Sequence, residues 1–452
     1  MDISHLNLHQ TLNEINTKKI AIILIQLFFF SAVIRSQSNL DWVSLPKEVN
    51  SDVYDLRVYN GDLVATGYFN KAGNIKVNRI AAWDGTNWNP LGEGIKGFAS
   101  FGLRMIVYQN NLYVSGFIDT AGTTNVNGIA KWDGTNWSDV GGGANEQIYS
   151  MAVYNNELYA AGAFDSIGGI AASHIAKWNG ANWQALGTGI QGYNVNDLLV
   201  YKNELYALGN FYSAGGIATN YIARWNGLNW NNVGVGVNYG NTALIEWNGK
   251  LLVGTYASAI SHIDPTIMQW DGLNWTIFSR QIMSWIGKFA VFQNTLYGAG
   301  GGSAGPPGSS FVMAWNSSSA QWQTLGTGVN SYVNAMCEFN GELYCAGDFN
   351  VSKGAYHNHI ARLTDVTGSH EVISQDLQLK IYPNPFTDHL KIEIQSGNVE
   401  IQKLVISDIF NHEFYRIENP ILNINTSFLK PGIYLLRIET NFGSRVFKLI
   451  RV

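Results

Sequence analysis

The sequence predicts an all-β protein: a seven-bladed β-propeller closed by its own N-terminal strand, followed by a small Ig-like β-sandwich. A phrase like the Trp-Asp-Gly-Thr-Asn-Trp of residues 83–88 recurs every 45 to 49 residues, a period typical of propeller blades. Asn-Gly and Asp-Gly pairs between short apolar runs predict hairpin turns. Only 13% of the residues are charged and 48 are Gly, which favours a turn-rich β fold over disorder.

Each repeat contains four expected strands. In the first repeat, apolar stretches at 53–59 and 63–69 flank an Asn-Gly turn, and a loop rich in Gly and Asn follows at 70–78. A third strand at 79–83 then turns through Asp-Gly into a fourth at 88–91. The same plan begins again at Leu103, Met151, Leu198, Ala243, Phe289 and Ala335, which gives seven units.

The seventh repeat has no Trp-bearing fourth strand after its third strand at 359–363. A segment of the missing type stands instead at the start of the chain, at 41–46, where Trp42 lies 46 residues before Trp88. We therefore expect this segment to complete the last blade. Such a clasp closes the ring and leaves fewer strand edges exposed.

The paired tryptophans are expected to pack between blades. With a two-residue turn Trp88 would lie opposite Ala81, and with a four-residue loop it would lie opposite Trp83. In both registers the two indoles share one face of the hairpin. A full set at equivalent positions is better explained by packing than by stacking on sugars.

Residues 1–37 are predicted to be a secretory signal outside the folded protein. Lys18 and Lys19 precede an apolar run at 20–34, and small polar residues follow it. The alternative is a membrane anchor, but the run is shorter than the roughly 20 residues that a spanning helix needs. The propeller is assigned to 38–368 and a linker to 369–376, and no transmembrane span is expected in the mature protein.

The last module, 377–452, is expected to contain only short strands and resembles the C-terminal sorting domain of the type IX secretion system of Bacteroidetes. The resemblance rests on Tyr-Pro-Asn-Pro-Phe at 382–386, on 429–438 and on the closing 447–452. It implies export across both membranes, with the type IX machinery as partner, to the outer cell surface or the medium. The sorting-motif residues are Tyr382, Pro383, Asn384, Pro385, Gly432, Tyr434 and Lys448.

The repeats resemble the Trp-Asp-Gly-containing propellers of cell-surface proteins and, more loosely, kelch-type blades. Kelch blades carry a Gly-Gly pair after the second strand, whereas most units here have a single Gly, such as Gly67. The Asp-box of sialidases needs one residue between Asp and Gly, which Asp84-Gly85 lacks, so sialidase catalysis is not expected.

Cys337 and Cys345 are the two cysteines of the chain and flank one expected hairpin turn. Neither register of that hairpin suits the Cβ separation of a disulfide, so two buried thiols are predicted.

No strong catalytic, metal-binding or phosphate-binding motif appears, so no enzyme activity and no cofactor or metal is expected. His174 and His359 occupy equivalent positions before a third strand, and Asp165 and Asp348 are interpreted as equivalent after the second. A polar ring on one rim is conceivable, but solvated loop ends are the simpler interpretation.

The long loops between second and third strands are expected to share one face and to bind a glycan or a protein, as in adhesion. The candidate residues are Phe69, Asp165, His174, Tyr212, Tyr221, Asp348 and His359. The alternative function is a secreted hydrolase or lyase of polysaccharides. A small net charge of −5 without a basic stripe disfavours nucleic acid as a partner, and a monomer is expected.

Overall fold

The computed structural model describes residues 40–97, 104–237, 241–255, 266–280, 285–301, 311–325, 328–349, 351–352, 355–356, 359–365, 379–394, 400–408, 413–418, 422–440 and 443–452. The predicted signal at 1–37 and linker at 369–376 lie outside these residues. Every element of regular structure in the described part is a strand, as the sequence predicted. The chain divides into two compact units, one holding the repeats and the other the C-terminal strands.

Within the described residues of the repeat unit, seven antiparallel sheets have the same path of four strands. The first three sheets consist of β2 (Val53–Tyr59), β3 (Asp62–Gly67), β6 (Ile80–Trp83) and β7 (Trp88–Pro90); β9 (Arg104–Tyr108), β10 (Asn111–Ser115), β13 (Ile129–Trp132) and β14 (Trp137–Asp139); and β15 (Ile148–Tyr154), β16 (Glu157–Gly162), β19 (Ile175–Trp178) and β20 (Trp183–Ala185).

The next three sheets consist of β21 (Ile190–Tyr201), β22 (Glu204–Ala214), β24 (Ile222–Trp225) and β25 (Trp230–Asn232); β26 (Asn241–Trp247), β27 (Lys250–Thr255), β28 (Thr266–Trp270) and β29 (Trp275–Arg280); and β30 (Trp285–Phe292), β31 (Thr295–Gly301), β32 (Val312–Asn316) and β33 (Gln321–Thr324). The last sheet is β34 (Val333–Phe339), β35 (Glu342–Gly347), β38 (Ile360–Asp365) and β1 (Leu40–Ser44).

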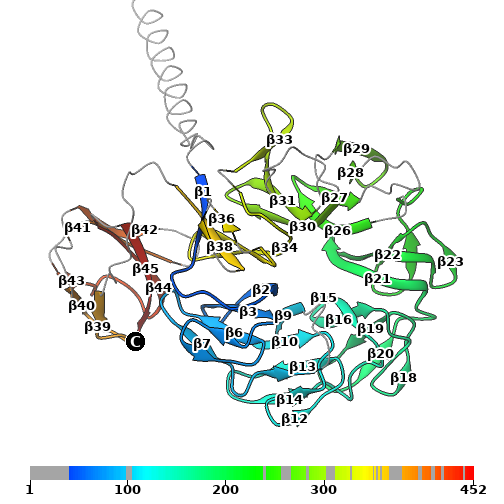
Figure 1. Cartoon of the computed structure of the whole chain (residues 1–452), viewed down its shortest axis with the longest axis horizontal. Coiled ribbons are helices and arrows are strands. Elements are labelled where there is room, and N and C mark those ends of the chain that lie inside the picture. The colour runs from blue at the N-terminus through cyan, green and yellow to red at the C-terminus, as the bar shows by residue number, and fades with distance from the viewer. Residues whose placement is uncertain are drawn as a thin grey trace, which may run out of the picture. The chain divides into compact units, whose positions relative to one another are not determined.

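These sheets follow one another around a common centre, in a propeller-like arrangement (Figure 1). The first strand of each sheet is innermost, and β2, β9, β15, β21, β26 and β30 pack against one another in chain order. The side-chain amide of Asn334 in β34 donates a hydrogen bond to the carbonyl of Val53 in β2, at 3.1 Å. This contact joins the last sheet to the first, so the ring closes at its centre.

The predicted clasp is confirmed. β1 pairs antiparallel with β38, and Trp42 lies directly opposite Leu363. The Trp42 side chain is fully buried. The closure extends to the next sheet, because the indole N–H of Trp88 donates to the carbonyl of Lys47, just after β1, at 2.6 Å.

The loop between second and third strands contains a short hairpin that the sequence did not predict. In the first repeat β4 (Lys71–Ala72) pairs with β5 (Ile75–Lys76). Two-residue strands are too short to show an alternating pattern. The same loop of other repeats holds the short strands β11 (Thr120–Ala121), β12 (Thr124–Asn125), β17 (Ser166–Ile167), β18 (Ile170–Ala171), β23 (Ile217–Ala218), β36 (Val351–Ser352) and β37 (Ala355–Tyr356). One further short strand, β8 (Ile95–Lys96), lies between the first and second sheets and pairs with β11.

The structure decides between the two registers of the tryptophan hairpin. Trp83 lies opposite Trp88, so the loop has four residues. The Asp84 carboxylate accepts the backbone N–H groups of Thr86 and Asn87, each at 2.7 Å, and thereby holds this loop in shape. The Asp of the repeated phrase is therefore a structural acceptor. Asp133, Asn179, Asn226, Asp271 and Asn316 make the same pair of bonds.

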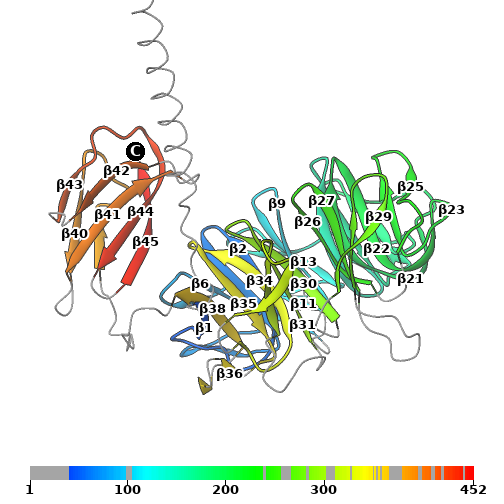
Figure 2. The same ribbon diagram turned by 90° about the horizontal axis from the view of Figure 1, so that it is seen from above.

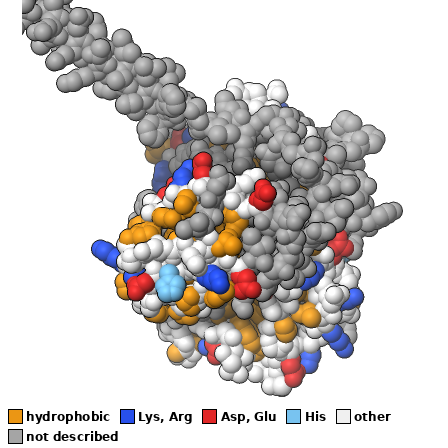
Figure 3. Space-filling model, turned by 90° about the vertical axis from the view of Figure 1, so that its left-hand side faces the viewer, with side chains coloured by type: hydrophobic (Ala, Val, Ile, Leu, Met, Phe, Trp, Pro, Cys, Tyr) orange, Lys and Arg blue, Asp and Glu red, His pale blue; other side chains and the backbone are white. Residues whose placement is uncertain are grey.

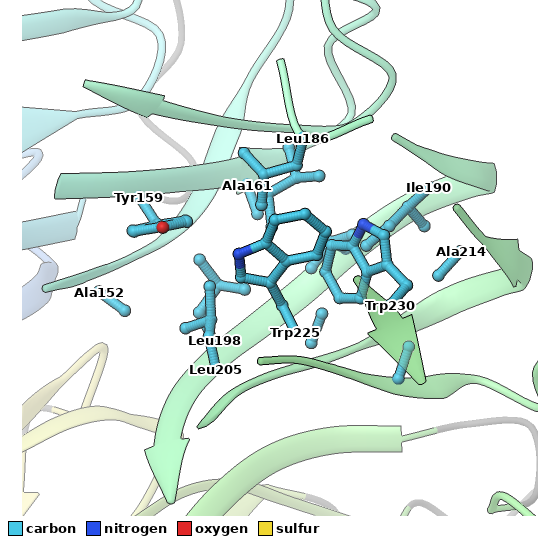
Figure 4. Close-up of a cluster of buried hydrophobic side chains, with 14 of the residues drawn as sticks. Ala152, Tyr159, Ala161, Leu186, Ile190, Leu198, Leu205, Ala214, Trp225 and Trp230 are labelled. Atoms are coloured by element: carbon cyan, nitrogen blue, oxygen red, sulfur yellow. The ribbon is translucent and has the colours of Figure 1, made fainter. Parts of the chain in front are cut away.

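The second tryptophan of a pair ties its sheet to the preceding one, as expected for a packing role. The indole N–H groups of Trp137, Trp183 and Trp275 donate at 2.8 Å to carbonyls of the preceding sheet. The fourth sheet departs from this series, because the indole N–H of Trp230 has no hydrogen-bond partner among the described residues. Trp230 and Trp225 instead pack with Leu186, Leu198 and Leu205 (Figure 4).

Replacing Gly141 by Ala is expected to lower the free energy of unfolding by about 2–4 kcal/mol. Gly141 has φ +62°, and an added Cβ would lie 2.4 Å from Cζ3 of Trp178. Gly187 has nearly the same φ, +60°, but open space around its Cβ position, so Gly187→Ala is a matched control for backbone strain alone. Denaturant unfolding should show the larger loss for Gly141→Ala, and equal losses would contradict a steric role.

The C-terminal unit consists of two antiparallel sheets that share one core (Figure 2). Phe386, Leu390 and Ile424 face Leu404, Leu436 and Leu449 in this core. One sheet contains β39 (Leu379–Tyr382), β40 (His389–Ile394) and β43 (Asn423–Asn425), and the other contains β42 (Glu413–Glu418), β41 (Ile401–Ser407), β44 (Gly432–Thr440) and β45 (Gly443–Arg451).

Cys337 and Cys345 do not form a disulfide with each other, as predicted. Cys345 is fully buried, whereas Cys337 is half-buried, so the prediction of two buried thiols is correct for Cys345 and wrong for Cys337. Burial raises the pKa of the Cys345 thiol well above its usual value, which keeps it protonated and unreactive.

Candidate functional site

One face of the ring carries the starts of the innermost strands and the hairpins after the second strands. We call it the loop face. It is built by a backbone feature that recurs in five of the seven sheets, a left-handed residue just before the third strand. Arg79, His174, Tyr221 and His359 have φ between +62° and +70°, and Gly128 has φ +73° at the equivalent place.

Backbone hydrogen bonds fix these left-handed residues. The N–H of His174 donates to the carbonyl of Phe164, and its carbonyl accepts from the N–H of Gly162. Arg79 makes the same pair of bonds with Phe69 and Gly67. Tyr221 and His359 repeat the pattern, so side chains of different chemistry stand on one common backbone.

Three of these side chains contact groups close by, and none of the three contacts another. The guanidinium of Arg79 donates to the carbonyl of Gly97 at 2.6 Å, and Nε2 of His174 lies 3.1 Å from the carbonyl oxygen of Gly192. Nδ1 of His359 lies 3.5 Å from a carboxylate oxygen of Asp52. Among the residues that the structure describes, no group of His, Cys, Asp and Glu is arranged to hold a metal ion.

Asp165 and Asp348 are not equivalent, which corrects the sequence interpretation. The N–H of Asp348 donates to the carbonyl of Tyr332, as the N–H of Ala163 does to Gln147. Asp165 lies two residues beyond Ala163, and its N–H instead donates to the side-chain oxygen of Asn145. Aligning the two aspartates by residue type therefore overlooked a shift in register.

The other candidate residues differ in exposure. Phe69 is fully buried in the core, so the prediction that it lies on the ligand-binding surface is wrong. Tyr212 is 68% exposed, and Tyr221 is half-buried at its left-handed position. Phe69 is buried because alternate residues of an extended segment point to opposite sides.

Sequence reasoning missed four exposed aromatic residues on the loop face. Tyr68 precedes the buried Phe69 and is 52% exposed, and Phe117 occupies the equivalent position of the next repeat. Tyr193 is 82% exposed and Tyr332 is 42% exposed, both at the start of an innermost strand. The signal was available in the sequence, since Tyr68 and Phe117 both directly follow a Gly that lies at the end of the second strand or just after it.

Charged and aromatic groups gather where the first and last sheets meet on this face. The guanidinium of Arg79 lies over the ring of Tyr68, 5.5 Å from its centroid. Loss of hydration on burial, together with Asp52 and Asp348, raises the pKa of Tyr54 to about 12. Burial, with a further contribution from Asp52, also raises the pKa of Asp348.

Replacing Asp348 by Asn is expected to stabilise the ring at pH 7. The raised pKa means that folding disfavours the ionised carboxyl, so this penalty is complete above the folded-state pKa and vanishes below the ordinary Asp pKa. The gain in melting temperature from Asp348→Asn should therefore shrink as the pH falls from 7 towards 4. Asp165→Asn, at an exposed position, is the control. A gain independent of pH would contradict the assignment.

On the side of the molecule that Figure 3 shows, Lys, Arg, Asp and Glu side chains are interspersed with hydrophobic and uncharged ones. No broad region of one charge is visible among the described residues in that view. This distribution agrees with the small net charge of the chain.

In the C-terminal unit, the sorting-motif segments that are distant in sequence come together. The N–H of Ile450 donates to the side-chain oxygen of Asn384 at 2.8 Å, and the N–H of Phe386 donates to the carbonyl of Ile450 at 2.9 Å. Pro383 and Pro385, on either side of Asn384, are exposed. The start of the unit is thus fastened to its last strand.

The remaining sorting-motif residues lie on neighbouring strands. Gly432 pairs with Arg451, and Lys448 lies opposite Leu435. The Tyr434 hydroxyl donates to the carbonyl of Lys430 at 2.8 Å. The ring of Tyr382 lies 5.7 Å from Nζ of Lys391.

Comparison with protein families identifies the C-terminal unit. Residues 380–451 match the family described as the secretion system C-terminal sorting domain. This domain indicates secretion through the type IX secretion system to the cell surface, as the sequence predicted. No curated protein matches the chain. No helix among the described residues has the length and apolar character needed to cross a membrane.

Solved structures resemble the chain in fold. One is the extracellular domain of a B. thetaiotaomicron protein described as a hybrid two component system, with 11% identity, a TM-score of 0.50, and coverage of 91% of this chain and 59% of that one. Another is PorZ, described as a surface component of the type-IX secretion system of Porphyromonas gingivalis, with 14% identity, a TM-score of 0.42, and coverage of 91% and 60%. The chain therefore spans less than two thirds of the length of either protein.

The WD40 beta propeller domain of Doa1 is also similar, with 11% identity, a TM-score of 0.47, and coverage of 72% of this chain and 97% of that one. At these identities the likenesses concern the fold alone. The extracellular domain from B. thetaiotaomicron supports the all-β architecture of this chain.

Proposed function

We propose that the chain is an exported binding module without enzymatic activity, whose loop face holds a glycan or protein ligand outside the cell. In this proposal the seven sheets are the blades of a propeller that β1 closes, and the sorting unit is an Ig-like sandwich. Residues 1–37 are the secretory signal, the source is a member of the Bacteroidetes, and the mature protein is a monomer. The sorting domain at 380–451 supports the exported location.

The observation that carries the proposal is a constant backbone with varied side chains on the loop face. The Trp pairs and turn acceptors repeat from sheet to sheet, whereas the left-handed position carries Arg79, Gly128, His174, Tyr221 or His359. Varied side chains on a rigid frame are the usual arrangement of a recognition surface. The Trp pairs and the turn acceptors, which keep the same chemistry from sheet to sheet, are explained by packing.

A glycan is the ligand class that this surface fits best. Tyr193 and Tyr212 are more than half exposed, and Tyr68 lies under the guanidinium of Arg79. A tyrosine ring offers a flat apolar face together with a polar hydroxyl, as a sugar offers apolar C–H groups and hydroxyls. Stacking on such rings requires no deep pocket, which agrees with an open loop face.

The test is binding of the purified full chain to glycan arrays and to arrays of extracellular matrix proteins. Replacing Tyr193 and Tyr212 together by Ser should weaken the detected binding about tenfold or more. The matched control replaces Leu228 and Leu273 by Ser, since both are 81% exposed but lie in the tryptophan hairpin loops. Equal binding by the parent chain and the tyrosine variant would overturn the proposal.

A second function, hydrolysis or eliminative cleavage of polysaccharides, is favoured by one observation. Asp348 lies near Asp52, Tyr54 and His359, and burial raises its pKa, which favours the protonated carboxyl that a general acid needs. Incubation with soluble polysaccharides should then release reducing ends. Asp348→Asn should abolish that release and Asp165→Asn should not, whereas no release by the parent chain would eliminate this function.

A further inference from the structure

A layer of polar residues lies at the centre of the ring. Each residue stands four positions before the end of an innermost strand, so the layer is set by the shared register of the sheets. Five positions carry Asp55, Arg104, Ser150, Asp197 and Lys288. The other two carry Ala243 and Ala335, both nearly fully buried.

The two carboxylates of the layer are already committed to backbone N–H groups. The oxygens of Asp55 accept from Leu56 at 3.0 Å and from Met105 in the next sheet at 2.7 Å. Asp197 accepts from Leu198 and from Leu244 of the next sheet, at 3.0 and 2.9 Å. Both residues therefore act as ties between adjacent innermost strands, and both carboxylates have fixed positions.

Lys288 has no comparable partner. No hydrogen bond or ion pair engages its ammonium within the described part of the chain. The adjacent positions of the layer carry Ala243 and Ala335, whose side chains have no polar atom. Lys288 as a whole residue is half-buried.

The electrostatic surroundings of Lys288 disfavour its positive charge. Loss of hydration lowers the pKa of the ammonium, and the nearby Arg104 lowers it further, while Asp197 and Asp55 act in the opposite direction. Arg57 adds a third positive charge nearby. A lysine held without a partner among other cations is stabilised by any anion that reaches it.

We propose that Lys288 forms an anion site at the centre of the ring, which takes the carboxylate of a ligand. The Arg104 guanidinium, which donates to the carbonyl of Tyr54 at 3.3 Å, adds a second positive charge to this site. A bound carboxylate accepts hydrogen bonds from the ammonium N–H groups, and its negative charge offsets the positive charges of Lys288 and Arg104. Uronic acid sugars and peptide C-termini both carry such a group.

Calorimetric titration of the full chain distinguishes these two sources. One arm compares galacturonate with galactose, and the other compares N-acetylglycine with N-acetylglycinamide. In each pair the members differ mainly in the carboxylate, and saturable binding is expected for the acid of at least one pair. Its affinity should be higher at pH 6 than at pH 9, because the bound form requires the ammonium. Equal binding of acid and neutral partner in both arms would overturn the proposal.

Variants test the residues. Lys288→Met should weaken binding of the acid about tenfold or more, whereas Lys76→Met, at an exposed position with the same charge change, should not. Ala243→Asp should also abolish binding, because it supplies an internal carboxylate beside Lys288. Because Lys288→Met removes a desolvated charge, its midpoint of thermal unfolding should be unchanged or higher. Lys288→Arg keeps the positive charge and should retain binding. Unchanged affinity in Lys288→Met and Ala243→Asp would refute the site.

The anion site is separate from the exposed tyrosines of the loop face. The double Tyr193 and Tyr212 variant should keep carboxylate binding, and Lys288→Met should keep the folded loop face. Failure of one proposal is therefore distinguishable from failure of the other.

Discussion

Deletion of residues 38–47 is expected to lower the melting temperature of the ring by about 10 °C or more. The deletion removes β1 and with it Trp42, whose side chain is fully buried. Loss of a buried Trp alone costs about 3–5 kcal/mol, and the deletion also exposes the edge of β38 and removes the carbonyl that Trp88 binds. Differential scanning calorimetry of the deleted and parent chains measures the effect.

Two substitutions separate the contributions within this clasp. Trp42→Ala should reproduce a large part of the loss, because it empties the core of the last sheet next to Leu363 and Leu343. Ser44→Ala, at a half-buried position of the same strand, should change the melting temperature little. An unaltered transition after deletion of the whole strand would show that the ring does not depend on it.

Removal of residues 377–452 is expected to stop delivery to the cell surface almost completely. The sorting domain lies within this segment, whereas the ring has cores of its own that contain none of these residues. The truncated chain should therefore remain inside the outer membrane, folded. Protease accessibility on intact cells and immunoblots of the medium report the location.

A milder change tests which contacts in the sorting unit matter. Asn384→Ala removes the acceptor for the N–H of Ile450 and loosens the start of the unit from its last strand. We expect reduced export with this variant, and normal export with Asn423→Ala in β43. Full surface delivery of the truncated chain would contradict the assigned role of the tail.

Much of the ring could be predicted from the sequence because its elements repeat. The period located the four main strands of each repeat, and the displaced Trp42 located the clasp. The register of the tryptophan hairpins could not be decided, because it depends on the side chain of Asp84 accepting two backbone N–H groups. The hairpin of β4 and β5 was missed because two residues show no periodicity.

The candidate site was harder to predict, for two physical reasons. Phe69 and Tyr68 are neighbours of similar chemistry, and alternation alone decides that the first is buried and the second exposed. Asp165 and Asp348 share a residue type but differ in register by two positions, which is visible only in their backbone bonds. The polar layer that contains Lys288 could be recognised only from the structure, because it depends on the common register of the innermost strands.

The pairing of β1 with β38 also sets the order in which this protein can mature. Leu40 lies opposite Asp365, so the two parts of the last sheet are separated in the chain by all six other sheets. During synthesis β1 must therefore stay unpaired until the last repeat has followed. Contacts across such a sequence separation form slowly and leave apolar surface open to aggregation in the meantime. A chaperone that shields β1 until β38 is available would therefore reduce aggregation before the ring closes.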